Sequence, residues 1–94
     1  KEAVMMYPYI TLGDGTEITH SQVIHADGVD KVVVHFERPT QDGFDSARCE
    51  LPSYTWTDWE GHFTAGEKSL FEELLHSNAH LLYRYAANGG VKVA

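Results

Sequence analysis

The fold is decided by a β-branched run in the first half of the chain, Val32-Val33-Val34-His35-Phe36. β-branched and aromatic residues favour extended backbone, so this run predicts a strand over residues 31–38. The pair Asp27-Gly28 precedes it and the turn-forming segment 39–43 follows it. Asp and Gly tolerate the positive φ angles that tight hairpins require. We therefore expect the strand to pair with a neighbour on each side.

Three further strands are expected around this one. Residues 16–25 precede Asp27-Gly28, and a second such pair, Asp14-Gly15, separates them from a strand over residues 7–12. Residues 44–51 alternate apolar and polar side chains after the turn at 39–43, which is the period of a half-buried strand. Four consecutive antiparallel strands form a meander.

The C-terminal third predicts one long helix over residues 65–88. Thr64-Ala65-Gly66-Glu67 matches the capping box, in which Thr64 and Glu67 satisfy each other's free backbone N–H groups. Apolar residues then recur at helical spacing: Leu70, Phe71, Leu74, Leu75, Leu81, Leu82, Tyr85 and Ala86. Asn88-Gly89-Gly90 ends the helix, and residues 91–93 can add a short strand.

These elements predict a single α+β domain, a four-stranded antiparallel meander packed on one C-terminal helix. The chain has 94 residues, which leaves no room for two cores. One helix buries its apolar stripe against one face of the sheet. The other face is then either solvated or a contact surface.

Composition limits the partners. The chain has 7 basic and 14 acidic residues, a formal charge of −7, with the cations scattered along it. Nucleic acids and anionic membranes are bound by clustered cations, so neither is expected. No apolar run approaches the roughly 20 residues that cross a bilayer, and the N-terminus lacks the features of a secretory signal. With Cys49 as the one cysteine, we expect a cytoplasmic protein that binds another protein or itself.

Strand register suggests one group of candidate site residues. If both Asp-Gly pairs are centres of two-residue turns, Tyr9 lies opposite His20 and His20 lies opposite His35; the turn at 39–43 then places Ser46 or Arg48 beside His35. The resulting row of Tyr9, His20, His35 and Arg48 could bind an anionic small molecule, supply an acid/base imidazole or respond to pH. Polar ladders on solvated sheet faces also serve structure or interfaces alone.

Two more polar groups have a functional and a structural interpretation. His76 and His80 are four apart on the predicted helix, a spacing that can chelate a metal ion, although solvated side chains also fit. Asn78 lies within the apolar stripe, where its amide must bond either to a backbone group of a sheet edge or loop, or across a dimer or ligand interface.

Cys49 and an aromatic segment complete the candidates. Cys49 shares a strand face with Ala47 and Leu51, which predicts a buried, inert thiol. Tyr54, Trp56 and Trp59 precede the helix; they either cover the open end of the core or form a ligand platform.

The sequence contains no phosphate-binding loop, dinucleotide fingerprint, paired-cysteine motif or hydrolase elbow, and no cofactor is expected. Three segments resemble those of small hypothetical bacterial proteins with no assigned activity: Val34-His35-Phe36-Glu37-Arg38-Pro39-Thr40, Asp42-Gly43-Phe44-Asp45 and Asn78-Ala79-His80-Leu81-Leu82-Tyr83. This resemblance covers most of the chain and implies no catalytic residues. The leading hypothesis is a non-enzymatic interaction or self-association module; the alternative is a small-molecule-binding domain or minor hydrolase built on Tyr9, His20 and His35.

Overall fold

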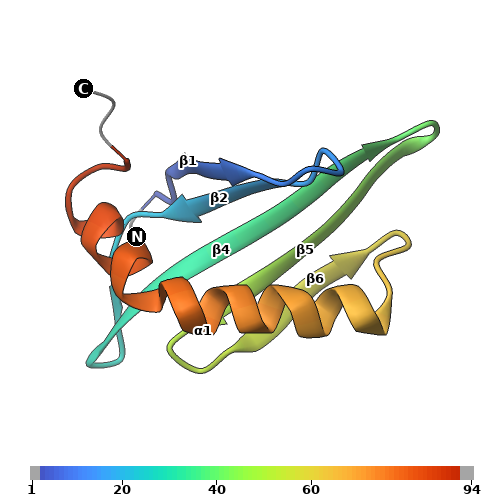
Figure 1. Ribbon diagram of the computed structural model, residues 1–94. Helices are drawn as coiled ribbons and strands as arrows, with labels where there is room; N and C mark the ends of the chain where they lie inside the picture. The colour runs from blue at the N-terminus through green and yellow to red at the C-terminus, as the bar shows by residue number, and fades with distance from the viewer. Residues whose placement is uncertain (1–2, 92–94) are drawn as a thin grey trace.

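The computed structural model describes residues 3–91 and confirms an antiparallel α+β fold with a C-terminal helix (Figure 1). Its elements are β1 (Met6–Thr11), β2 (Glu17–Ser21), β3 (Ile24–Ala26), β4 (Val29–Thr40), β5 (Gly43–Leu51), β6 (Thr55–Glu60) and α1 (Ala65–Ala87). The sheet order is β1-β2-β4-β5-β6, with β3 beside the first part of β4. The short strand expected at residues 91–93 falls mostly outside the described residues.

The predicted count of four strands was wrong, first because residues 16–25 are not one strand. Across the Asp27-Gly28 turn, Ala26 pairs with Val29, as a two-residue turn requires. Beyond a break at Gln22-Val23 the register slips by one residue, so His20 lies opposite Val34 instead of His35. At this break the Ser21 hydroxyl oxygen accepts the Val33 N–H at 2.8 Å. The hydroxyl thus bonds a backbone group of β4 where the ladder is interrupted.

The sixth strand, β6, occupies a segment that the sequence predicted as a connection. A turn at Pro52–Tyr54 leads into it, with Tyr54 at a φ of 59°. The pairing with β5 shifts between Ser46 and Arg48, near Asp58, whose φ is 43°. This irregularity adds a residue to β6, and Trp56 and Trp59 come into edge-on contact, 5.2 Å between ring centroids.

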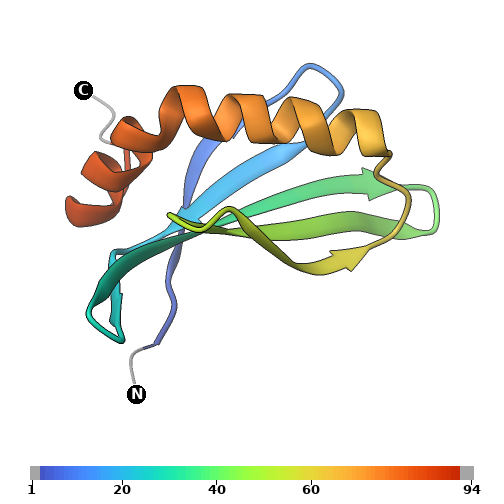
Figure 2. The same ribbon diagram turned by 90° about the horizontal axis from the view of Figure 1, so that it is seen from below.

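Helix α1 covers one face of the sheet, which we call the helix face (Figure 2). The expected capping box is present: Thr64 accepts the Glu67 N–H, and the Glu67 carboxylate accepts the Thr64 N–H. Helix residues Phe71, Leu75, Leu82 and Ala86 are buried against a strand layer made of Ile18, Val32, Val34, Phe36, Ala47, Cys49 and Leu51. The opposite side, the open face, has no helix over it among the described residues.

Arg38 links three parts of this fold from the helix side of β4. Its guanidinium donates to Asp45 at 2.8 Å, to Asp14 at 3.1 Å and to Glu67 at 2.5 Å. It also lies 4.7 Å from the ring centre of Phe63. One cation therefore joins the β1–β2 loop, strand β5 and the first turn of α1.

Acidification should destabilise the protein through these carboxyl groups. Hydrogen bonds from Arg38 lower the pKa values of Asp45 and Glu67, and the Thr16 backbone N–H lowers the pKa of Asp14. As pH falls, the unfolded chain binds these protons first. The stabilisation is therefore complete above the ordinary pKa values of Asp and Glu, about 4, and is lost as pH drops through the lower folded-state pKa values.

Urea unfolding at a series of pH values from neutral to acid checks this expectation. The free energy of unfolding should fall most steeply in the acid range, and the slope should be smaller in Arg38→Met, which lacks the donor that the carboxylates share. Equal pH dependence in the two proteins would contradict the assignment.

Candidate functional site

The open face presents transverse rows of polar side chains from neighbouring strands. Directly paired residues share a face, so the pairing defines the rows. The central row contains Pro8, Thr19, His35, Arg48 and Thr57. The next row, toward the β4–β5 hairpin, contains Thr11, Glu17, Glu37, Ser46 and Glu60.

His35 and Arg48 form the centre of the open face. They are direct partners in the β4–β5 ladder, which is the second of the two pairings that the sequence allowed. Both are half-buried. Burial lowers the pKa of His35, and the neighbouring Arg48 charge lowers it further. The imidazole is therefore neutral at pH 7, whereas Arg48 carries a charge that has no ion-pair partner among residues 3–91.

Beside this pair lies a row of unpaired carboxylates. Glu17 is directly opposite Glu37, and Glu60 is in the same row two strands away. Like charges in directly opposed positions destabilise a sheet. Within the described part of the chain, none of the three carboxylates has an ion pair, whereas Lys31 and Glu50 on the same face are 3.2 Å apart. The open face thus carries charged groups that form no close ion pair within the described part of the chain.

The structure divides the predicted row of four residues between two faces. The one-residue slip of β2 moves His20 to the helix face, where it is fully buried with its Nδ1 atom 2.8 Å from the Ser21 carbonyl oxygen. Tyr9 joins it there because the β1–β2 register shifts between Pro8 and Ile10. Their ring centroids are 6.1 Å apart. Tyr9 and His20 therefore meet each other, and His35 and Arg48 meet each other, but the two pairs are separated by the sheet.

Asn78 has hydrogen-bond partners within its own chain. Its side-chain nitrogen donates to the Leu74 carbonyl at 2.8 Å, and its oxygen accepts the Tyr9 hydroxyl at 2.6 Å. Burial raises the pKa of Tyr9, so the hydroxyl remains a donor. The amide connects α1 to edge strand β1, which matches the structural interpretation more closely than an interface role.

The helix histidines lie on an exposed side of α1. His76 stacks on Tyr54, with ring centroids 4.0 Å apart, and His80 is exposed. Among residues 3–91, no group of three or more His, Cys, Asp or Glu side chains is arranged to hold a metal ion.

The two tryptophans cover the end of the core next to the helix N-terminus. Trp56 lies 5.6 Å from Phe36, between ring centroids, and its indole N–H donates to Glu72 at 2.8 Å. Trp59 contacts Phe63 edge-on at 6.0 Å. The Trp56 contacts fit the interpretation of this segment as a cover for the core, whereas Trp59 is 36% exposed.

Cys49 is buried, as the strand pattern predicted, and burial raises the pKa of its thiol to about 12. A thiolate is the reactive form, so the native protein should react with a disulfide reagent such as DTNB at least ~100-fold more slowly than the protein in denaturant. Absorbance of the released thiol measures both rates. Rapid labelling of the native protein would place Cys49 at an accessible surface instead.

Comparisons of the chain with protein-family models, with curated proteins and with solved structures found no match. In the part of the chain that the structure describes, α1 is not long and apolar enough to span a membrane. What the protein does must therefore be inferred from its own side chains.

The carboxylate row could not be predicted from the sequence, for an identifiable reason. With His20 opposite His35, Glu17 would lie opposite Arg38, an ordinary cross-strand ion pair. The one-residue slip of β2 instead carries Glu17 to the open face opposite Glu37, while Arg38 lies on the helix face with Asp45 and Glu67. Only knowledge of the break at Gln22-Val23 could have revealed this row.

Proposed function

We propose that the protein is a non-enzymatic interaction module whose open face binds another polypeptide, either a second copy or a different chain. The observation that carries this proposal is the unmatched charge at the centre of an uncovered sheet face. Arg48 lacks an ion-pair partner among the described residues, and Glu17 opposes Glu37. Local arrangements that cost stability without a compensating contact are expected where a protein binds something else.

The side chains of the open face predict which groups the surface of the partner carries. Arg48 pairs best with a carboxylate, which a guanidinium can hold through two parallel hydrogen bonds. His35, neutral at pH 7, adds a hydrogen bond, and the glutamate row accepts Lys or Arg side chains. A second copy supplies both kinds of charge. If a two-fold axis lies between the rows, the glutamate row of each copy faces the His35–Arg48 row of the other.

Self-association is tested by sedimentation and light scattering of three proteins over a wide range of concentration. Arg48→Glu reverses the charge at the centre of the open face, and Arg84→Glu makes the same change on an exposed part of α1. If a second copy binds the open face, the mass rises with concentration in the original protein and in Arg84→Glu, but not in Arg48→Glu.

If the protein is strictly monomeric, the proposed partner is a different polypeptide. A photo-crosslinking amino acid, incorporated in the cells that produce the protein, tests this form of the proposal. The cross-linker replaces Thr57 on the open face or Arg84 on the helix. A discrete adduct that forms from position 57 and not from position 84 is the expected result. Monomeric protein with no adduct specific to position 57 would refute the proposal.

A further inference from the structure

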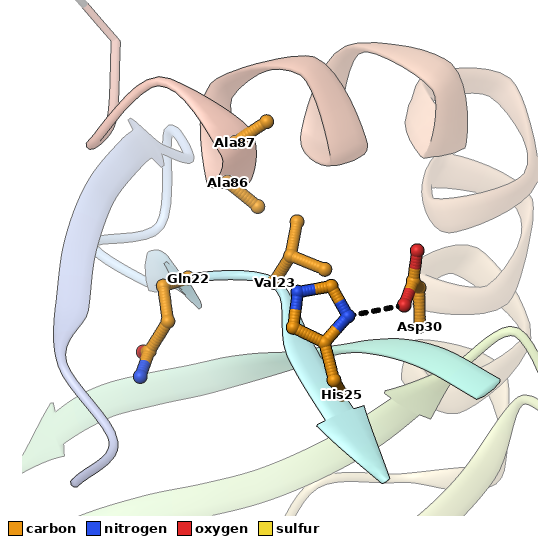
Figure 3. Close-up of a pocket in the computed structure, with 6 residues that line it drawn as sticks. All are labelled: Gln22, Val23, His25, Asp30, Ala86 and Ala87. Atoms are coloured by element: carbon orange, nitrogen blue, oxygen red, sulfur yellow. Dashed lines mark hydrogen bonds and ion pairs between the residues drawn. The ribbon is translucent and has the colours of Figure 1, made fainter. Parts of the chain in front are cut away.

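A second feature, separate from the open face, is a cavity where the sheet is interrupted (Figure 3). It is an open cavity of about 430 Å³, in which the His25 and Asp30 side chains are 73% and 62% exposed. It lies between the break after β2, the β3–β4 hairpin and the last turn of α1. The residues around it are Gln22, Val23, His25, Asp30, Ala86 and Ala87.

A histidine–carboxylate pair stands at one side of this cavity. His25 and Asp30 are direct partners in the β3–β4 ladder, and the His25 Nδ1 atom is 2.5 Å from an Asp30 carboxylate oxygen. Because a carboxylate only accepts hydrogen bonds, Nδ1 carries the proton and a neutral ring has Nε2 as a free acceptor. Figure 3 shows this second nitrogen on the side of the ring that faces Gln22 and the helix end. Tyr83 steadies the hairpin by donating to the Asp30 backbone oxygen at 2.8 Å.

Most of the groups that remain free around the cavity are hydrogen-bond acceptors. The Gln22 amide oxygen accepts the Met5 N–H at 2.9 Å and its nitrogen donates one N–H to the Ala3 carbonyl, which leaves one amide N–H as a donor. Asp30 is the one acidic residue in the lining, and neither Lys nor Arg belongs to it. The C-terminal end of α1, at Ala86 and Ala87, adds partial negative charge. Val23 and the two alanines supply apolar surface.

From this combination we infer that the cavity binds a small primary amine in its ammonium form. The ammonium group donates to His25 Nε2 and to the Asp30 carboxylate, and a short alkyl chain lies against Val23 and Ala86. An acceptor-lined cavity disfavours a carboxylate ligand, because its oxygens would face other acceptors. A neutral alcohol supplies a single donor and no charge.

The probe is n-butylammonium chloride, titrated into the isotopically labelled protein and followed by amide chemical shifts. Sodium butyrate and butan-1-ol, which have similar alkyl chains, are the comparison ligands. We expect saturable shifts at Val23, His25 and Ala86 with a dissociation constant on the order of millimolar, as suits so small a ligand. The two comparison ligands should bind at least ~10-fold more weakly.

Two variants locate the contacts. His25→Phe keeps a ring but removes the acceptor, and Asp30→Asn keeps the shape but removes the charge; each should weaken butylammonium binding about tenfold. His62→Phe, which changes an exposed histidine near Asp45, should bind as the original protein does. No saturable shift at these amides, equal binding of butan-1-ol, or unchanged binding in both variants would overturn the inference. Because the open face is untouched in these variants, either proposal can fail without the other.

Discussion

Replacement of Phe71 by alanine is expected to lower the free energy of unfolding by about 4 kcal/mol, which is a large share of the stability of a small domain. Phe71 is only 2% exposed. Its ring stacks on Phe36, with centroids 4.3 Å apart, and contacts Phe63 edge-on at 5.1 Å. Truncation leaves a cavity at the main contact between α1 and the sheet. Urea unfolding followed by circular dichroism measures the loss.

Two neighbouring valines in β4 allow the loss of stability on the helix face to be compared with the loss on the open face. Val34 is fully buried under α1, whereas Val33 points to the open face and is half-buried. We expect Val34→Ala to cost about 2 kcal/mol and Val33→Ala less than about 1 kcal/mol. Similar losses in the two variants would mean that both faces are packed, contrary to the architecture described above.

Replacement of Arg38 by methionine is the second large effect, with an expected loss of about 3 kcal/mol. Methionine keeps an unbranched apolar side chain but removes the guanidinium over Phe63 and with it every donor to Asp14, Asp45 and Glu67. The three carboxylates would then face one another without a cation. The loss should appear in the midpoint of urea unfolding at neutral pH.

Arg84→Met is the control for that change, because Arg84 is exposed on α1 and has no ion pair among the described residues. Its expected effect on the free energy of unfolding is within about 0.5 kcal/mol. If the two substitutions were equally mild, Arg38 would not be the link between β5, the β1–β2 loop and the helix.

Much of this fold could be predicted from local chemistry. Thr64 and Glu67 mark the start of α1 because a capping box acts within four consecutive residues. The alternation of Ala47, Cys49 and Leu51 with polar neighbours identifies the buried side of β5. Each of these signals depends only on residues close together in the sequence.

The errors arose where a side chain replaced a backbone contact. The Ser21 hydroxyl accepts the Val33 N–H, and this substitution allows β2 and β3 to pair with β4 in two registers. No local sequence pattern at Gln22-Val23 predicts such a break. Strand β6 was missed for another reason: an extra residue near Asp58 disrupts the alternation that would have marked a strand.

The candidate site residues also divide into those that local sequence placed correctly and those that a register shift moved. His35 and Arg48 were placed together because the hairpin at 39–43 is short and its register has few possibilities. The expected pairing of Tyr9 opposite His20 was wrong, because Tyr7 takes that position. The Tyr9 ring instead contacts His20 edge-on on the helix face, where register shifts on both strands carry the two residues. An alternating ladder converts every one-residue shift into a change of face.

The open face should be exposed to solvent in the isolated chain and covered when a partner binds. Methyl relaxation by a soluble gadolinium chelate tests it most directly, because Val33 and Val34 are neighbours that point to opposite faces. In dilute protein shown to be monomeric, we predict strong relaxation of the Val33 methyl groups and little of Val34, with Val33 becoming protected in the associated state. Equal protection of both valines in the monomer, or continued exposure of Val33 after association, would contradict it.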